Sequence, residues 1–140
     1  MSTKEIPLQI VDFNHRTFAG NVASVSVPSI KGYLTILPHH IPLVTPLGHG
    51  EITIRHTDGK EEFLAVSGGF LVITTTQITI MADSAEHTHE LDEQKIMEAK
   101  TKAEQMLKEK QFADDRGYAD AVSALERSLN QLKILRKRKK

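Results

Sequence analysis

The sequence predicts an α+β protein: an all-β N-terminal sandwich of about ten antiparallel strands, followed by an α-helical hairpin. Three observations predict it: a break in composition near residue 86, apolar residues at a period of two before the break, and helical periods after it. All five prolines and seven of the eight glycines precede residue 70. Residues 1–86 carry 5 basic and 8 acidic side chains, whereas residues 87–140 carry 13 and 10. We therefore expect one domain over residues 1–86 and a second over residues 87–140.

Short apolar or β-branched runs mark the strands of the first domain. They are Leu8–Val11, Val22–Val27, Glu51–Arg55 and Gln77–Ile80. Asp58-Gly59 predicts a hairpin turn between Ile52–His56 and Glu61–Val66, because both residue types tolerate positive φ. Strands at such close spacing, with no helix between them, predict an antiparallel sandwich or barrel.

Two segments of the first domain interrupt the strand pattern. Ser67-Gly68-Gly69 predicts a strand bulge that needs glycine dihedrals. A phosphate-binding loop is disfavoured there, because no Lys-Ser/Thr pair and no helix follow the glycines. Proline cannot occupy a central strand, so the prolines within residues 36–47 predict an exposed, stiffened loop or edge segment.

Two amphipathic helices are expected in the second domain. The first runs from about Asp92 to Gln111, with Asp92 as its N-cap. Its apolar stripe comprises Ile96, Ala99, Ala103, Met106 and Leu107, and that of the second helix Tyr118, Ala121, Val122, Leu125, Leu129, Leu132 and Leu135. The small side chains of Ala99 and Ala103 would let the second helix approach closely. Residues 112–117 break the pattern, so a six-residue connection should join the helices as an antiparallel hairpin.

Composition excludes several classes of protein. The 18 basic residues balance 18 acidic ones, which excludes a globally basic nucleic-acid binder. There is no cysteine, so disulfides, thiolate metal sites and thiol nucleophiles are excluded, and the cytoplasm is the simplest compartment. No apolar run is long enough to span a membrane, and the first residues lack the layout of a signal peptide.

The histidines invite a metal-site interpretation, which the pattern does not support. His39-His40 and His87-Thr88-His89 offer imidazole pairs, and two imidazoles on one side of a strand suit zinc. No third ligand stands at a diagnostic spacing, so we expect no metal and histidines exposed to solvent. Scattered Ser, His and Asp residues also give no catalytic triad, so a serine-hydrolase function is disfavoured.

Four segments together resemble the epsilon subunits of F-type ATP synthases. Gly32–Leu47 (GYLTILPHHIPLVTPL) matches the pattern G-x-L-x-I-L-P-x-H-x-P-L-x-T-x-L of that family. Ala65–Leu71 is similar to its glycine-containing strand, Ile78–Asp83 to its last strand, and Leu91–Lys100 to the start of its first C-terminal helix. The segments occur in the family's order, and the resemblance covers residues 6–136.

This resemblance implies a ten-stranded β-sandwich and a helical hairpin in a non-catalytic subunit of the central rotor. The sandwich would dock on the gamma subunit and the c-subunit ring. The interface residues implied are Tyr33, Pro38, His39, His40, Ile41 and Pro42. Prolines stiffen this loop and lower the entropy cost of binding, although loop statistics alone favour an inert turn. Tyr33 departs from the many family members that carry an acidic residue there.

The resemblance also implies a regulatory role for residues 87–140. The helices either fold down on the sandwich or extend along gamma toward the catalytic alpha and beta subunits, and the extended form blocks ATP hydrolysis. The inhibitory tail would comprise Leu132, Lys133, Leu135, Arg136, Lys137 and Arg138. The alternative is a solvated helix end, where cations suit the helix dipole. The subunit would lie peripherally at the cytoplasmic face of the cell membrane, without lipid insertion or nucleic-acid binding.

Some family members bind ATP on the hairpin, through an I/L-D-x-x-R-A motif and nearby charges. The corresponding residues here are Glu86, Asp92, Lys95 and Lys102. Lysine replaces the motif's arginine and cannot reproduce its planar, bidentate contact with phosphate, so at most a weak ATP site is expected and no other cofactor. These charges otherwise form a solvated helix face with i,i+3 and i,i+4 pairs, such as Asp92–Lys95 and Glu98–Lys102.

Three functions therefore compete. The first is a rotor subunit that inhibits ATP hydrolysis through its C-terminal helices in a proton-translocating ATP synthase. The second is a small ATP sensor that acts through the hairpin, and the third is an RNA-binding accessory protein with a basic tail. The third is disfavoured because no aromatic residues alternate with the basic ones.

Overall fold

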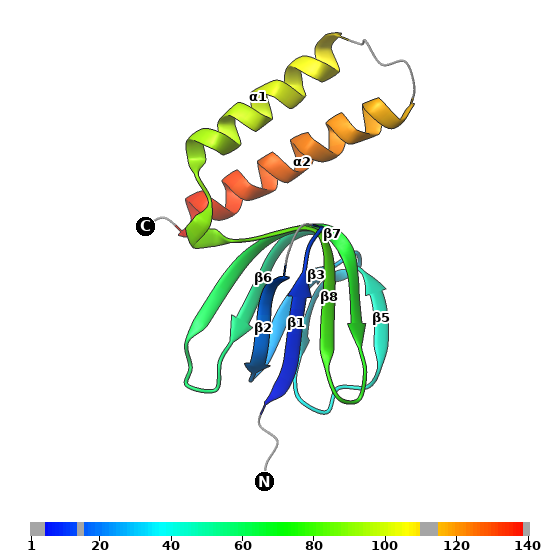
Figure 1. Ribbon diagram of the computed structural model, residues 1–140, viewed down its shortest axis with the longest axis vertical. Coiled ribbons are helices and arrows are strands. Elements are labelled where there is room, and N and C mark those ends of the chain that lie inside the picture. Colours follow the sequence, from blue (N-terminus) through cyan, green and yellow to red (C-terminus); the bar gives the residue numbers. More distant parts are fainter. Residues whose placement is uncertain (1–4, 14–15, 110–114, 139–140) are drawn as a thin grey trace. The chain divides into compact units, whose positions relative to one another are not determined.

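The computed structural model describes residues 5–13, 16–109 and 115–138, and its chain divides into two compact units, Met1–His89 and Glu90–Lys140. The described residues of the first unit form eight strands, and those of the second form two helices (Figure 1). The strands are β1 (Ile6–Val11), β2 (Arg16–Val22), β3 (Ser24–Ser29), β4 (Gly32–Ile36), β5 (Leu43–Pro46), β6 (His49–Arg55), β7 (Glu61–Ile73) and β8 (Ile78–His87). The two α-helices are α1 (Glu93–Glu109) and α2 (Asp115–Arg138), and the short 3-10 turn η1 (Thr88–Glu90) follows β8.

The strands follow the order β2-β1-β8-β7-β6-β3-β4, and β5 pairs with β7. All neighbours are antiparallel except β1 and β8, which run parallel with Leu8 opposite Ile78. The expectation of a purely antiparallel sandwich is wrong at this pair. A short turn fixes antiparallel pairing, whereas the first and last strands are joined only through the rest of the unit.

The described residues contain eight strands rather than about ten, because β7 and β8 each continue through a crease. In β7 the residues that belong to the buried core cluster are Leu64 and Val66 before Gly68, but Leu71 and Ile73 after it. The core-facing positions thus change from even to odd numbers. A strand with strict alternation would keep one parity. The strand therefore turns its opposite face to the core beyond the crease.

Glycines make this crease. Gly68 has a φ of 72° and Gly69 a φ of 117°, a region that side chains disfavour. The predicted need for glycine dihedrals is confirmed. The predicted bulge is wrong, because the register with β8 is unbroken: Ser67 lies opposite Ser84 and Gly69 opposite Ala82. No residue is inserted, so the paired strands bend together.

The neighbouring strands turn at the same level. The Gly68 amide donates to the carbonyl of Gly48 at 3.1 Å, and the Leu47 amide donates to the carbonyl of Gly69 at 2.8 Å. These bonds lie where β5 ends and β6 begins, so both edges of β7 are held through the crease. β5 is thereby an edge strand that ends in Pro46, as the proline pattern predicts.

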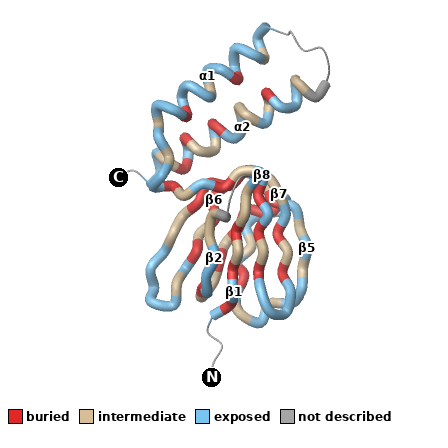
Figure 2. Tube along the Cα trace, in the orientation of Figure 1, coloured by how far each residue is buried: buried red, intermediate tan, exposed pale blue. Residues whose placement is uncertain are grey.

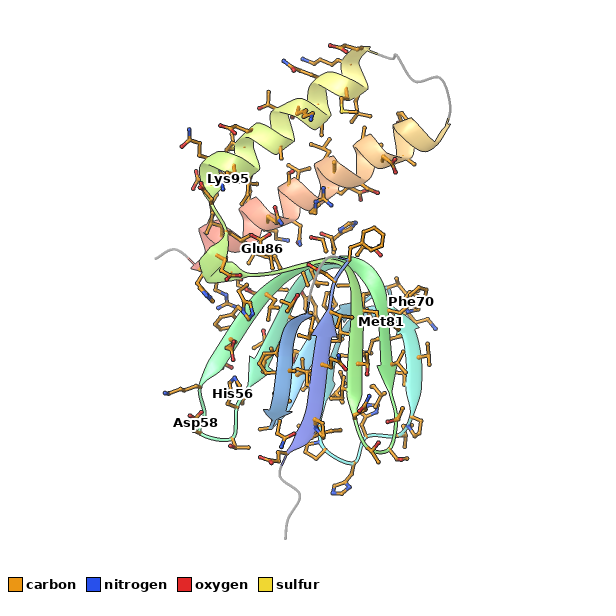
Figure 3. All side chains as sticks on the ribbon, in the orientation of Figure 1. His56, Asp58, Phe70, Met81, Glu86 and Lys95 are labelled. Carbon is orange, nitrogen blue, oxygen red and sulfur yellow. The ribbon has the colours of Figure 1, made fainter. Side chains whose placement is uncertain are left out.

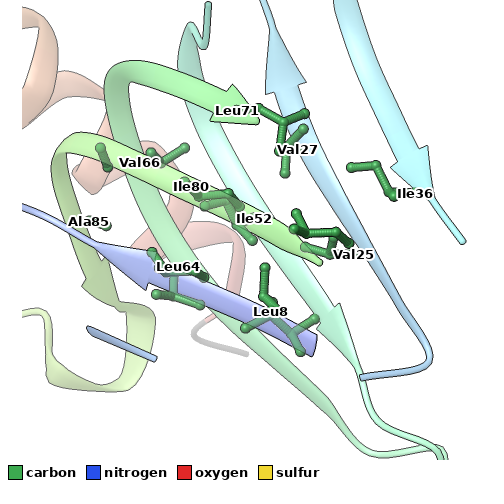
Figure 4. Packing of buried hydrophobic residues seen from close by; sticks show 14 of the residues in the cluster. Leu8, Val25, Val27, Ile36, Ile52, Leu64, Val66, Leu71, Ile80 and Ala85 are labelled. Carbon is green, nitrogen blue, oxygen red and sulfur yellow. The ribbon is translucent and has the colours of Figure 1, made fainter. Parts of the chain in front are cut away.

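The core lies between parts of the sheet that are not adjacent in the strand order. Leu8 from β1, Val25 from β3 and Ile36 from β4 belong to one buried cluster (Figure 4). The sheet must therefore fold over on itself, which makes the sandwich. Figure 2 shows buried and exposed residues alternating along its strands, as a period of two requires.

Of two local features predicted from the sequence, the Asp58-Gly59 turn is correct and the Val22–Val27 strand is not. Gly59 has a φ of 90° between β6 and β7, and its amide donates to the His56 carbonyl at 3.0 Å, so the Asp58-Gly59 turn is confirmed. The run Val22–Val27 is not one strand. Its second residue, Ala23, separates β2 from β3 and donates its amide to the Arg55 carbonyl at 2.8 Å.

Helix α1 begins where the sequence predicts. The Asp92 carboxylate accepts hydrogen bonds from the amides of Gln94 and Lys95 at 3.0 and 3.4 Å. It satisfies two of the amides that every helix leaves unpaired at its start. The end of α1 and the predicted connection fall partly on residues 110–114, outside the described residues. Gly117, assigned to that connection, already lies inside α2.

The helices pack through a narrower seam than the stripes predict. Ile96, Ala103, Ala121 and Leu132 are buried, but Ala99, Met106, Tyr118 and Leu129 are exposed. Ser128 and Ile134 are also buried, and neither was in the predicted stripe. Ser128 is accommodated because its hydroxyl donates to the Ala124 carbonyl at 3.0 Å. A seam containing Ala and Ser lets the helix axes approach closely.

We predict that Gly69→Ala destabilises the sandwich by about 2–4 kcal/mol, since it combines backbone strain with steric overlap. A Cβ at this position would overlap the Met81 carbonyl and the Ala82 Cα. Urea unfolding of the whole chain measures the effect. Gly59→Ala is the matched control, because its φ is also positive but nothing lies within 4 Å of its Cβ position. Equal losses in both variants would show that close approach of β8 is unimportant.

Candidate partner-binding surfaces

The predicted interface loop is a defined turn with exposed apolar side chains. The His40 amide donates to the Leu37 carbonyl at 3.2 Å, and His39 has a φ of 71°. Proline at the second position and a left-handed third residue are typical of a type II turn. Leu37 and Ile41 are exposed on either side of it, while Pro38 is half-buried. The loop thus presents apolar groups on a backbone that is already ordered.

Tyr33 lies apart from that loop. It is the second residue of β4, and the loop follows the last residue of β4. Strand geometry separates the two by about 10 Å or more. The Tyr33 hydroxyl accepts a hydrogen bond from the Glu51 amide at 3.0 Å, yet the residue is 63% exposed. The structure therefore holds Tyr33 in a fixed orientation and does not join it to the loop.

A third surface was missed by sequence reasoning. We call it the apolar row: Ile30, Pro46, Phe70 and Met81, which are all exposed. The Ile30 amide donates to the Pro46 carbonyl at 3.3 Å, Pro46 lies opposite Phe70, and Phe70 lies opposite Met81. Figure 3 shows Phe70 and Met81 side by side on β7 and β8. Directly opposed residues share one face of a sheet, so the side chains of Pro46, Phe70 and Met81 form one continuous strip, and Ile30 adjoins its Pro46 end through the backbone bond.

Each member of the apolar row looks ordinary in its own segment. Single exposed apolar residues are normal at protein surfaces, and only contiguity gives them meaning. Phe70 is 51% and Met81 45% exposed, and Val44, two residues before Pro46 in β5, adds a further 66% exposed side chain. The only sequence signal was an aromatic residue directly after the Gly68-Gly69 pair. The strip suits burial by a partner protein.

The predicted ATP-site residues have structural roles or lie exposed. Asp92 caps α1 and meets Lys95 through the backbone amide of that residue. Lys95 and Lys102 are exposed on α1, two helical turns apart. Glu86 is exposed on β8, in the other compact unit (Figure 3). Glu98 and Lys102 both line the same open, shallow depression of α1. The described contacts of Glu86, Asp92, Lys95 and Lys102 thus do not gather these residues around one ligand.

The predicted inhibitory tail is partly engaged within the hairpin. Leu132 is buried, Leu135 is half-buried, and the basic residues 133 and 136–138 are exposed. The Arg136 guanidinium lies 3.9 Å from the carboxylate of Glu93, at the start of α1. Both side chains are substantially exposed, and such a pair contributes about 0–1 kcal/mol. This pair therefore adds little to the stability of the contact between the end of α2 and α1.

The described residues contain no group of three His, Asp or Glu side chains able to hold a metal ion. Within the same part of the chain, no helix is both long and apolar enough to cross a membrane. What the structure presents instead is a set of surfaces: a loop, an apolar row and a basic helix end.

Comparison with known proteins matches both compact units to one family. Residues 5–88 match the family described as ATP synthase, Delta/Epsilon chain, beta-sandwich domain, and residues 89–136 match its long alpha-helix domain. An ATP synthase epsilon chain of Moorella thermoacetica is 40% identical over 90% of this chain and 92% of its own length. An ATP synthase epsilon chain of Dehalococcoides mccartyi is 37% identical over 97% of this chain and 96% of its own length.

Solved structures share the fold. A chain in the structure of the Euglena gracilis mitochondrial ATP synthase, OSCP/F1/c-ring, aligns with a TM-score of 0.75 at 22% identity, covering 95% of this chain and 82% of that one. A chain in the structure of the Tetrahymena thermophila mitochondrial ATP synthase central stalk and c-ring aligns with a TM-score of 0.57 at 12% identity. The alignment covers 96% of this chain and 99% of that one. The sandwich, the hairpin and their order along the chain agree with the sequence matches. The chain therefore belongs to the ATP synthase delta/epsilon family, as an epsilon chain.

Proposed function

We propose that the sandwich docks this subunit on gamma and on the c-subunit ring, and that the hairpin inhibits ATP hydrolysis by changing its packing. As an epsilon chain it is a non-catalytic subunit of the central stalk of ATP synthase, and it belongs to a membrane-associated complex. We assign the subunit to the cytoplasmic face of the cell membrane. The extended helices would bind the alpha and beta subunits. A proton is the coupling ion in this proposal.

The apolar row is the observation that carries the docking proposal. It gathers Pro46, Phe70 and Met81 into one exposed strip on a rigid sheet. A rigid apolar surface loses little conformational entropy on binding, so burial translates efficiently into affinity. The loop Pro38–Pro42 and Tyr33 lie elsewhere on the sandwich and remain candidates for the c-ring contact.

The hairpin has the properties of an element with two packings. The seam between its helices is narrow, and the Arg136–Glu93 ion pair at its end is exposed. A second apolar stripe beside the seam is exposed to solvent in part. Tyr118 and Leu129 are exposed on that stripe, with Val122 and Leu125 half-buried between them. Opening the hairpin exposes Leu132, so the extended form requires a partner that covers this side chain. An acidic surface would also engage the basic residues that follow it.

An ATP-sensing function has no specific support. The Asp92 carboxylate is occupied by amides of its own helix, and lysine stands where relatives that bind ATP use arginine. We therefore keep ATP binding as an outcome to be measured in the isolated chain rather than as a second proposal.

Phe70→Glu should weaken binding of the gamma subunit at least about tenfold, because it places a charge in the centre of the apolar row that gamma would bury. Phe13→Glu is the matched control, since Phe13 is 94% exposed on the β1–β2 connection. Titrated binding of purified gamma to each full-length variant measures the effect. Unchanged affinity of the Phe70 variant would move the docking surface to another part of the chain.

Deleting Leu132–Lys140 should raise ATP hydrolysis by the assembled enzyme and leave assembly intact. The deletion removes the basic residues and the apolar Leu132 that the extended form would bury, but not the sandwich. Reconstituted enzyme is assayed at low and moderate salt, because exposed charges are screened within about 8 Å at physiological ionic strength. Equal hydrolysis rates with full-length and truncated subunit would refute an inhibitory tail.

Ala103→Leu should have the opposite effect and strengthen inhibition. The added side chain overpacks the seam by about 1–3 kcal/mol and favours the opened hairpin. Ala99→Leu makes the same change on the exposed face of α1 and should leave hydrolysis unchanged. The same hydrolysis assay compares both variants with the unmodified subunit. Relief of inhibition by Ala103→Leu would mean that the packed hairpin, and not the opened one, is inhibitory.

A further inference from the structure

A depression lies on the outer face of β1, β2 and the start of β8, which are neighbours in the sheet (Figure 1). Its volume is about 230 Å³. We call it the amide pocket and define it by the outward-facing residues among those that line it: Pro7, Gln9, Ala19, Asn21 and Gln77. Pockets that hold a whole small molecule usually enclose about 300 Å³ or more, so this one suits a single side chain.

The amide pocket combines short apolar side chains with longer polar ones. Asn21 lies opposite Pro7, and Ala19 lies opposite Gln9, across the β1–β2 pair. Opposed residues share one face of a sheet, and this face is the outer one because the intervening Leu8 is buried. The side chains of Pro7 and Ala19 end close to the backbone, whereas the others end in carboxamides. An apolar base thus stands beside polar groups.

Hydrogen bonds around the amide pocket use donors of its carboxamides and leave acceptors. Asn21 Nδ2 donates to Glu5 Oε1 at 3.0 Å, because a carboxylate only accepts. Gln77 Nε2 donates to the Thr79 hydroxyl at 3.1 Å. The carbonyl oxygens of both carboxamides, and the Glu5 carboxylate beside them, can therefore accept further hydrogen bonds. None of the described residues that line the pocket is basic, so the lining supplies no cation to these oxygens.

The amide pocket adjoins the apolar row on the same face of the sheet. Gln9 lies opposite Thr79 in β8, and Val11, two residues further along β1, lies opposite Met81. Residues two apart on a strand point to the same face and lie about 7 Å apart. A partner that covers Met81 and extends along β1 by this distance therefore reaches Gln9 and the pocket.

We propose that the amide pocket receives a basic side chain of the protein that covers the apolar row. The guanidinium of arginine fits best, because its planar fork of five donors matches the carbonyl oxygens of Asn21 and Gln77, and Glu5 supplies the opposite charge. The aliphatic stem of that side chain packs on Pro7 and Ala19. An apolar occupant would leave the oxygens without donors. This inference rests on the proposed docking of gamma and adds the contact that fixes the register of gamma on the sheet.

The test measures titrated binding of purified gamma to full-length variants. Gln9→Lys places a like charge beside the basic side chain and should weaken binding about tenfold at low salt. Gln9→Glu places an opposite charge there and should tighten binding about threefold. Both effects should shrink at higher salt, because exposed charges are screened. Ala19→Leu fills the pocket without changing its charge and should weaken binding about tenfold at either salt concentration.

The matched controls are Thr57→Lys and Thr57→Glu, which make the same charge changes at an exposed residue of the β6–β7 turn, outside the pocket. They should leave the affinity unchanged. Urea unfolding checks that each variant is folded, and the Gln9 pair remains decisive if Ala19→Leu is not.

The Phe70→Glu variant separates this inference from the docking proposal. If Phe70→Glu weakens binding but the Gln9 variants behave like the Thr57 controls, the docking proposal stands and the amide pocket is overturned. The same holds if Gln9→Lys tightens binding, because the occupant is then acidic. If Phe70→Glu leaves the affinity unchanged, the docking proposal fails and this inference fails with it.

Discussion

The crease at Gly68-Gly69 is the constraint on which the rest of the sandwich depends. A Cβ at Gly69 would overlap the backbone of β8, so only glycine lets the two longest strands stay paired while they bend. The bend changes which face of each strand points to the core. One pair of residues thereby lets a single sheet close around one apolar cluster.

The same crease creates the surface that we propose for partner binding. Phe70 follows the glycine pair directly, at the position where β7 turns its other face outward. Had the strand kept its parity, the even-numbered Phe70 would point inward with Leu64 and Val66. The fold and the proposed docking surface are thus linked through backbone geometry, because the bend that closes the core also exposes the aromatic ring beside Met81.

The two units resist change to different degrees. The sandwich buries large aliphatic side chains completely, and each such side chain stabilises a fold by about 1.5–3 kcal/mol. The hairpin has few large buried side chains, a seam with Ala103 and Ser128, and an exposed Arg136–Glu93 pair. A rigid sandwich and a helix pair with few large buried side chains suit the proposed function, in which the subunit stays attached while its helices change partners.

The sequence by itself determined the features that neighbouring residues control. It predicted the order of strands and helices, the Asp58-Gly59 turn, the Asp92 cap and the glycine dihedrals, because backbone sterics and local hydrogen bonds decide these. Its family signature also identified the chain. Only the tertiary structure decided the parallel β1–β8 pair, the exposure of Ala99 against the burial of Ala103, and the apolar row. Each of these depends on which distant segments pair, and periodicity within one segment carries no information about its partner.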